Sequence, residues 1–400
     1  MIFTENLTLA ARILYNNIIN LLFEMGEAAM ILIFEQPDYA RSVWCTHIVS
    51  SLVSELRLKR LPFCMISSLD ELSGGTAGDF VFLVGSGGDF IAEGLKAAGR
   101  AGVYPILLNS RARDELTVGC SMVCSDMEGS MKDIVDRLRA CGRGRIALYG
   151  VNPRSIGDVC RRAYFLQTAG AREDDIFFND GSLENCFSAF RPRAHAYDAA
   201  ICANDFAAIS LVRRLSACDP GALERLFIIG CAETRLTDFY ADHIVSVRGN
   251  FAEYGRAAVA LIDTLKRNPS LSRVEMFIRW DVDALSADRA AVPPPEPAFE
   301  RSAKTDAFYE DEELREMLCV ERLLNACDAL DRQILRRTLM GESYEDVAER
   351  CFINVSTVKY RLRKMIGISG AESRIDLMRI VRRYLPEGAS LEDEAESAPQ

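Results

Sequence analysis

The first 285 residues alternate short, almost wholly apolar runs with stretches long enough to form helices. Six apolar runs have the length and composition of a strand buried on both faces: 30–35, 80–84, 104–108, 145–149, 199–203 and 225–230. Helix-length stretches separate them, at 44–56, 90–101, 131–141, 155–168 and 206–216. This alternation predicts an α/β fold with doubly wound parallel sheets and helices on both faces. The length allows two such halves.

Proline marks the end of this α/β unit. Pro293, Pro294, Pro295 and Pro297 lie within five residues. Because proline fixes φ and has no backbone N–H, we expect an extended linker over residues 286–311. The chain then divides into an N-terminal amphipathic helix (1–28), a two-lobed α/β unit (29–285), the linker, a small all-α domain (312–385) and an acidic disordered tail (386–400).

The charge of the chain is unevenly distributed. With 47 basic and 58 acidic residues the net charge is -11, which argues against a general polyanion binder. Between Arg350 and Tyr384, however, nine basic residues face two acidic ones, a net charge of +7. A basic patch on an acidic protein favours nucleic acid as a partner of the small domain.

Cysteine and histidine usage constrains the redox and metal chemistry. Thirteen cysteines at irregular spacings and three histidines predict free, mostly buried thiols in a reducing compartment, with no metal and no cofactor. The apolar segment 7–23 is interrupted by Arg12 and by three asparagines, so we expect neither a membrane span nor a signal peptide. The sequence is therefore interpreted as that of a cytoplasmic protein without a membrane partner.

A glycine-rich turn, Gly85–Gly88, follows one predicted strand and precedes a predicted helix. It lacks the lysine and hydroxyl residue of a phosphate-binding P-loop and the third glycine of a dinucleotide fingerprint. We interpret it as a tight turn at the carboxyl edge of the sheet, where open α/β sheets bind ligands.

Several segments of the α/β unit resemble the sensor domains of the lactose/galactose-repressor (LacI/GalR) family. The matching segments are 123–129, Arg145–Gly150 with Asn152, Ser155 and Arg161, then 164–170, Asp198–Asp205, Leu226–Gly230 and 247–259. They occur in the order of the family and cover about residues 30–285. The resemblance implies a type I periplasmic-binding-protein-like fold, in which three crossovers join two lobes around a cleft for a small effector.

The chemistry of the expected cleft suits a small polar effector. The guanidinium of Arg161 offers a planar fork of donors, Asn204 and Asp205 donate and accept hydrogen bonds, and Tyr39 could stack on a ring. The full set of candidate effector-binding residues is Tyr39, Ser86, Asp126, Asn152, Ser155, Arg161, Asn204 and Asp205.

Two positions depart from the family pattern in this region. Ala232 stands where an aspartate is usual, and Gly249 stands where a glutamine is usual. We therefore expect a ligand other than a simple pentose or hexose and favour an anion, because Arg161 would lack an acidic partner at position 232. The alternative is a degenerate pocket, or one that binds a protein. No nucleophile lies in an elbow motif, so an enzyme is not expected.

The residues after the linker show the periodicity of a helical domain. Met317, Val320, Leu324 and Cys327 recur at spacings of three and four. Further helices are expected over 330–339, 343–348 and 355–366, with a last helix ending at Tyr384. Capping boxes at Ser343–Asp346 and Ser369–Glu372 should open two of these helices, and Asn354 should cap the helix that begins at residue 355.

This small domain resembles the LuxR-type helix-turn-helix. The match rests on 330–335, 341–343, 347–348, 353–359, Gly367, Arg374 and Leu377, with Asn354 in place of a capping serine and Arg361 in place of a histidine. The resemblance implies double-stranded DNA as partner, and the alternative is a solvated cationic helix in a protein-interaction bundle. Because a single helix-turn-helix makes few contacts, we expect a homodimer. RNA polymerase is a further candidate partner. The candidate DNA-binding residues are Asn354, Ser356, Thr357, Lys359, Tyr360, Arg361, Arg363 and Lys364.

Together these patterns predict a DNA-binding transcriptional regulator whose helix-turn-helix is controlled by an effector between the lobes of the sensor. The sensor precedes the DNA-binding domain, the reverse of the usual order in LacI-like proteins. Two alternatives stay open, a solute-binding receptor and an adaptor that senses a partner protein.

Overall fold

The computed structural model of this chain describes residues 30–40, 42–74, 79–109, 119–232, 234–282 and 311–386. The predicted N-terminal helix, almost all of the linker and the acidic tail lie outside these ranges. The chain forms two compact units. Of the described residues, the first lobe holds those up to Ala40, those of His47–Ser125 and those of Phe251–Ile278. The second unit holds those of 42–46, those of 126–250 and those from Arg279 onward.

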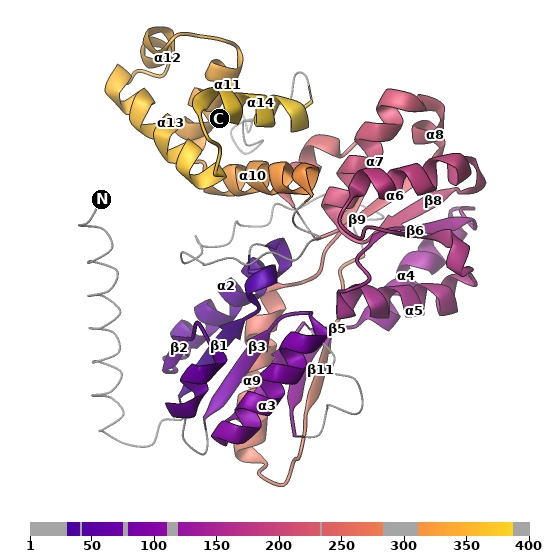
Figure 1. The fold of residues 1–400 in the computed structure, drawn as a ribbon, viewed down its shortest axis with the longest axis vertical. Helices are drawn as coiled ribbons and strands as arrows, with labels where there is room; N and C mark the ends of the chain where they lie inside the picture. Colours follow the sequence, from indigo (N-terminus) through magenta and orange to yellow (C-terminus); the bar gives the residue numbers. More distant parts are fainter. Residues whose placement is uncertain are drawn as a thin grey trace, which may run out of the picture. The chain divides into compact units, whose positions relative to one another are not determined.

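A six-stranded parallel sheet forms the centre of the first lobe, in the order β11-β5-β4-β3-β1-β2. Its strands are β1 (Ile31–Glu35), β2 (Phe63–Met65), β3 (Phe80–Val84), β4 (Tyr104–Leu108), β5 (Ser121–Ser125) and β11 (Glu275–Ile278). Helices α2 (Val43–Leu58), α3 (Gly88–Ala101) and α9 (Ala252–Arg267) accompany it (Figure 1). Every residue of β3 is buried, as expected of a central strand.

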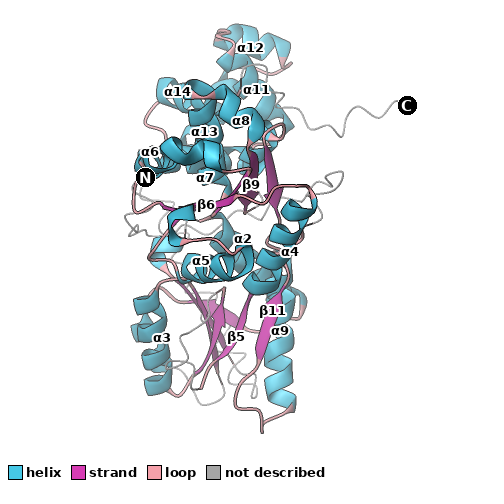
Figure 2. Cartoon of the chain, turned by 90° about the vertical axis from the view of Figure 1, so that its right-hand side faces the viewer, coloured by secondary structure: helices cyan, strands magenta, loops and turns pink. Residues whose placement is uncertain are grey.

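The second unit contains a five-stranded parallel sheet in the order β10-β9-β8-β6-β7, which we call the second lobe with its helices. Its strands are β6 (Ile146–Val151), β7 (Ile176–Phe178), β8 (Ala199–Cys202), β9 (Phe227–Cys231) and β10 (Ile244–Val247). Its helices are α4 (Met127–Ala140), α5 (Ile156–Ala169), α6 (Leu183–Phe190), α7 (Asp205–Cys218), α8 (Pro220–Arg225) and the 3-10 helix η5 (Arg235–Tyr240) (Figure 2).

The predicted fold class is confirmed. All six predicted strands are present, and two of them, at 80–84 and 104–108, have the predicted bounds. The two sheets share one topology, with strand order 2-1-3-4-5 and β11 added at the edge of the first. In each sheet the second strand lies on one side of the first strand and the third strand lies on the other, so the strand order reverses at that point. The resulting switch points lie between β1 and β3 and between β6 and β8.

Five helices follow residue 310 and pack with the second lobe in the same compact unit (Figure 1). They are α10 (Glu312–Ala326), α11 (Ala329–Leu339), α12 (Tyr344–Arg350), α13 (Val355–Ser369) and α14 (Arg374–Tyr384). The predicted capping box of α12 is confirmed, because Asp346 N donates to Ser343 Oγ at 3.1 Å and Ser343 N donates to the Asp346 carboxylate at 3.2 Å.

The predicted capping box at Ser369–Glu372 is wrong. Helix α13 continues through Ser369 and ends at Gly370, whose positive φ of 74° favours glycine. The N-cap of α14 is Ser373, whose hydroxyl accepts a hydrogen bond from Asp376 N at 3.1 Å. Within the described residues, no helix is long and apolar enough to cross a membrane.

Candidate functional site

Four of the eight candidate effector residues follow strands at the two switch points. In the first lobe, Tyr39 follows β1 and Ser86 follows β3; in the second lobe, Asn152 follows β6 and Asn204 follows β8. The carboxyl edge beside a switch point is where doubly wound sheets bind ligands. The sequence therefore places polar side chains at the expected edge of each lobe.

In the first lobe, the glycine-rich turn is filled by a neighbouring side chain. The amides of Ser86 and Gly87 donate to Gln36 Oε1 at 2.9 and 2.8 Å. A Cβ on Gly87 would lie 2.5 Å from Gln36 Nε2, so the turn is built around this amide. Tyr39 is buried close by in the sequence, 3% exposed. Because Gln36 takes both amides, the turn does not offer them to a phosphate.

In the second lobe, three candidate residues contact one residue that sequence analysis missed, Asp158, two of them through its carboxylate. Asp158 forms a buried ion pair with Arg161 and accepts a hydrogen bond from Asn152 N at 2.9 Å. Its own amide donates to Ser155 Oγ, the N-cap of α5, at 3.4 Å. The guanidinium of Arg161 also lies over the ring of Trp280, 5.4 Å from its centroid. Asp158 therefore fixes the orientation of the Arg161 side chain.

Two buried donors in this part of the second lobe have no hydrogen-bond partner among the described residues, Arg161 Nε and Asn179 Nδ2. Asn179 directly follows β7. Its backbone N–H donates to the Val151 carbonyl at 2.8 Å, which places Asn179 beside the end of β6. An unpaired buried donor is destabilising, so both are suited to an oxygen-rich ligand. Sequence analysis missed Asn179 because a three-residue strand precedes it.

The other candidate residues of the second lobe hold its own backbone. Asn204 Oδ1 caps α7 by accepting from Ala207 N at 2.9 Å, and Asp126 caps α4 by accepting from Gly129 N at 3.0 Å. Asp205 is fully buried and accepts hydrogen bonds from the Thr234 amide and from three hydroxyls. Burial raises the pKa of Asp205, and these donors oppose the rise.

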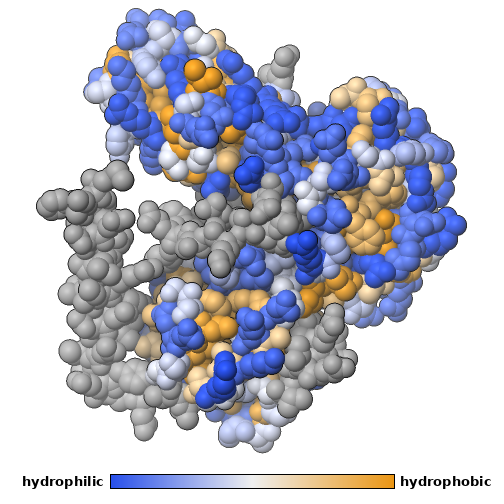
Figure 3. All heavy atoms as spheres, viewed as in Figure 1, coloured by the Kyte–Doolittle hydropathy of each residue, from blue (hydrophilic) through white to orange (hydrophobic). Residues whose placement is uncertain are grey.

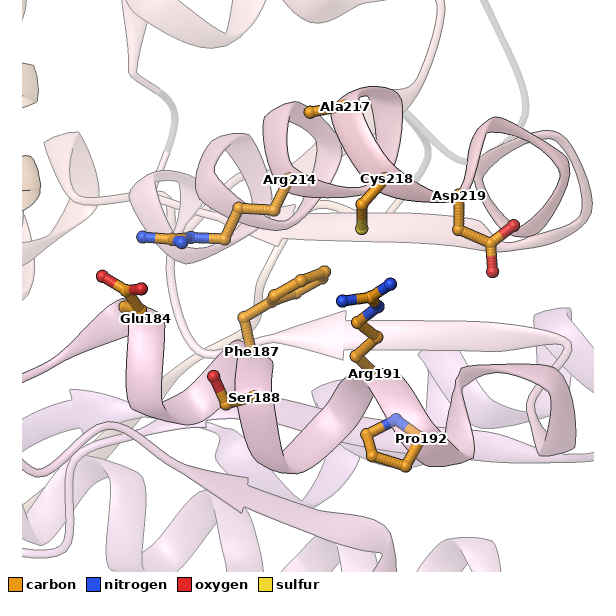
Figure 4. A pocket seen from close by; sticks show the side chains of 9 residues that line it. All are labelled: Glu184, Phe187, Ser188, Arg191, Pro192, Arg214, Ala217, Cys218 and Asp219. Carbon is orange, nitrogen blue, oxygen red and sulfur yellow. The ribbon is translucent and has the colours of Figure 1, made fainter.

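A surface hollow of about 670 Å³ lies between α6 and α7 (Figure 4). Arg191 and Arg214 contribute guanidinium groups, and Phe187 lies between them. None of the predicted effector residues lines this hollow, whose complete lining is Glu184, Phe187, Ser188, Arg191, Pro192, Arg214, Ala217, Cys218 and Asp219.

The candidate DNA-binding helix is α13, and Asn354 sets its first turn. Asn354 Oδ1 accepts hydrogen bonds from Thr357 N and Thr357 Oγ1, each at 2.8 Å, and from Ser356 Oγ at 2.5 Å. Asn354 is therefore an N-cap, as predicted, and the two hydroxyls are turned toward it. Helix α12 and the turn Cys351–Ile353 precede this cap, which gives the helix-turn-helix order.

One face of α13 presents basic and aromatic groups to solvent. Lys359, Arg363 and Lys364 are exposed, and the Tyr360 side chain is 68% exposed. Lys359 lies 5.4 Å from the centroid of the Tyr344 ring, and Arg374 stacks on the same ring at 4.5 Å. Figure 3 shows a largely hydrophilic surface over these helices, interrupted by an apolar patch.

Arg361 differs from its neighbours on α13, because its guanidinium is engaged within the domain. Its Nη1 donates to Asp328 at 2.8 Å and to Asp331 at 2.8 Å. Both acids belong to the start of α11, where Asp328 is the N-cap. This contact joins α13 to α11. Arg363, by contrast, is exposed and has no ion pair or hydrogen bond among the described residues.

The described residues contain no group of three or more histidine, cysteine, aspartate or glutamate side chains that could hold a metal ion. The thirteen cysteines all lie within these residues and are free thiols.

The two switch-point sheets define the fold class of the α/β unit, a two-lobed fold of the periplasmic-binding-protein type. No protein-family model and no curated protein matches the sequence. Solved structures of LacI-type regulators share the fold at low identity. A transcriptional regulator CelR in complex with cellobiose has a TM-score of 0.52 and 20% identity, over 64% of this chain and 82% of that one.

Two further solved structures give the same result. A putative LacI-type regulator from Bacillus cereus subsp. cytotoxis has a TM-score of 0.52 and 12% identity, over 64% of this chain and 96% of that one. The Lac repressor bound to ONPG has a TM-score of 0.52 and 14% identity, over 65% of this chain and 82% of that one. The α/β unit thus has a LacI-like two-lobed fold.

Proposed function

We propose that the protein is a transcriptional regulator that binds double-stranded DNA through α12 and α13 and responds to a small effector bound by its sensor. The observation that carries this proposal is the face of α13, on which Lys359, Tyr360, Arg363 and Lys364 are all exposed beside the helix-turn-helix turn. Such a helix can enter the major groove, while cations next to it neutralise phosphates.

Two partners follow from this reading. A single helix-turn-helix makes few contacts, so we propose that a homodimer places two copies of α13 on half-sites about one helical turn apart. RNA polymerase is the partner we propose for transcriptional control. The solved LacI-type structures that share the fold include complexes with cellobiose and ONPG, which supports a small-molecule effector.

The effector we propose is rich in hydroxyl groups and bears no net charge. The sequence favoured an anion because Arg161 was expected to lack an acidic partner. Position 232 is alanine, but Asp158 supplies Arg161 with an acidic partner from the same helix, which removes the reason to prefer an anion. The donors that stay available are Arg161 Nε and Asn179 Nδ2, which suit neutral oxygen acceptors such as hydroxyls.

The test of DNA binding is selection from a random library of duplexes with the full-length protein. Enrichment of a two-fold-symmetric sequence is expected, and Arg363→Ala should weaken binding to the selected duplex. The loss should be about 1–3 kcal/mol if Arg363 reads a base, and smaller and sequence-independent if it contacts phosphate. Glu345→Ala, an exposed residue on α12, is the control. Failure to enrich any duplex would refute the proposal.

The test of effector binding is a thermal-shift screen of sugars, sugar phosphates, nucleosides and carboxylates. A ligand at a hundredfold excess over its dissociation constant adds about 2.7 kcal/mol of stability. We expect a neutral polyol or glycoside to stabilise the wild type and not Asn179→Ala, while the exposed-surface control Asn185→Ala keeps the response. An anion that stabilises the wild type and Asn179→Ala equally would refute the assignment of Asn179.

A further inference from the structure

Helix α10 packs on the second lobe and on the other C-terminal helices at the same time. Toward the second lobe, Glu313 accepts a hydrogen bond from Ser210 Oγ at 3.0 Å and pairs with Arg214 at 2.7 Å. Toward the C-terminal helices, Arg322 donates to the Ser369 carbonyl, at the end of α13, at 3.2 Å. A shift of α10 on the second lobe is therefore transmitted to α13.

The most buried contact of α10 with the second lobe is a carboxylate bound to backbone amides. Glu321 is 2% exposed and accepts hydrogen bonds from Arg235 N at 2.9 Å and Leu236 N at 2.8 Å. Asn325 donates to the same carboxylate at 2.9 Å. These amides belong to the first turn of η5, where backbone donors have no partner within the helix. A buried carboxylate needs such donors, so the contact fixes α10 at one position.

The same short loop is held from its other side by the sensor. Asp205 Oδ2 accepts hydrogen bonds from Thr234 N at 2.8 Å and from Thr237 Oγ1 at 3.1 Å. Asp205 begins α7 directly after β8, at the switch-point edge of the second lobe. Three consecutive backbone amides of the loop therefore bind two different carboxylates. The amide of Thr234 donates to Asp205, and those of Arg235 and Leu236 donate to Glu321.

The loop is also conformationally constrained where it leaves β9. Ala232 has a φ of 140°, a region that favours glycine. A non-glycine residue stays in such a conformation only where the surroundings determine it, and here the buried bonds of Asp205 and Glu321 follow within a few residues. A segment held in this way can take only a small number of discrete positions, so a change at one end is passed on to the other end rather than absorbed.

We propose that the loop Thr234–Thr237 connects the effector-binding edge to the DNA-binding helices, with Asp205 holding it on the sensor side and Glu321 of α10 holding it on the DNA side. This inference rests on the proposed function and describes how that function is regulated. An effector moves α10 by binding more tightly to one position of the loop than to another.

The first test needs no DNA and no effector. Hydrogen exchange of residues 312–326 is measured in the full chain for the wild type, Thr237→Val, Glu321→Gln and the double variant. Thr237→Val lies outside α10 and removes a hydroxyl that contacts Asp205 and, within the loop, the Thr234 carbonyl and hydroxyl. We expect both single variants to speed exchange in α10 between about 5-fold and 150-fold, the range of typical coupling between sites. The double variant should exchange more slowly than the product of the two effects predicts.

The matched control is Thr237→Ser, which keeps the hydroxyl and should exchange like the wild type. The proposed connection through the loop would be overturned if α10 exchanges as slowly in Thr237→Val as in the wild type while it exchanges fast in Glu321→Gln. Strictly multiplicative effects in the double variant would overturn it too.

The second test uses the duplex that the wild type selects from the random library. Thr237→Val and Glu321→Gln should both weaken binding to it, although neither residue is on α13. Unchanged affinity in both variants, with faster exchange in α10, would overturn the regulatory role of the loop. If the wild type selects no duplex, the proposed function fails, and the exchange measurement still decides whether the loop holds α10.

Discussion

Replacement of Arg361 by alanine separates two roles for this residue, contact with DNA and attachment of α13 to α11. Nη1 of Arg361 lies 2.8 Å from Asp328 Oδ2 and 2.8 Å from Asp331 Oδ1. The Asp331 side chain is 2% exposed, whereas that of Asp328 is 56% exposed. Arg361→Ala therefore leaves one deeply buried carboxylate without its closest cation.

The magnitude follows from the burial of the two pairs. Removal of one partner of a buried ion pair costs about 3–5 kcal/mol, and an exposed pair contributes at most about 1 kcal/mol. The Arg361 side chain is itself 24% exposed, and Lys364 stays 3.8 Å from Asp331 as a substitute partner. We therefore expect the C-terminal helices of Arg361→Ala to lose about 2 kcal/mol of their free energy of unfolding.

Urea unfolding of the variant, followed by circular dichroism, measures this loss, and fluorescence anisotropy with the selected duplex measures affinity. The control is Arg363→Ala, two residues further along α13, which should keep its unfolding midpoint and lose affinity. An Arg361→Ala protein with a wild-type midpoint and a large loss of affinity would refute the argument. Arg361 would then be a direct DNA contact.

Three further predictions concern buried contacts, each checked by urea unfolding. Gly230→Ala should destabilise the protein by about 1–3 kcal/mol, because its Cβ would lie 2.2 Å from Asp205 Oδ1. Asp205→Ala should lower stability by about 1–3 kcal/mol per buried donor left unpaired, and Asp205→Asn by less. Burial raises the pKa of Glu316, but hydrogen bonds from Arg379 and Tyr384 hold it below its usual value. The contribution of the Glu316 carboxylate to the free energy of unfolding is complete above its unfolded pKa of about 4.5 and is lost as the pH falls below that value. The free energy of unfolding of Glu316→Gln should therefore fall less steeply with decreasing pH than that of the wild type.

The buried central strands could be predicted from the sequence because both of their faces are apolar. Phe80–Val84 and Tyr104–Leu108 are almost continuous hydrophobic runs that no helix pattern explains. Strands β2 and β7 have three residues each, which is too short for any periodicity to register. The edge strand β11 exposes Phe277 and is partly polar, so its composition does not distinguish it from a loop.

Polar residues of the candidate site that directly follow a strand could be predicted from the sequence. Contacts between side chains from distant segments could not. Asn152 and Asn204 are found from their position alone. That Arg161 pairs with Asp158 was not foreseen, although i,i+3 spacing on a helix allows it. The contact of Glu321 with η5 joins residues 85 positions apart, and no local pattern indicates it.

The shared packing of α10 has a consequence for how such a protein can be recombined. The proline-rich segment is the obvious place to exchange one DNA-binding module for another, because the composition changes abruptly there. A transplanted set of C-terminal helices would include a foreign α10, and Arg214 and the first amides of η5 would lose Glu313 and Glu321. A breakpoint after Cys327 would instead separate α10 from the core that it forms with α13 and α14. Functional chimaeras should therefore graft the lobe-facing residues of α10 onto the incoming helix.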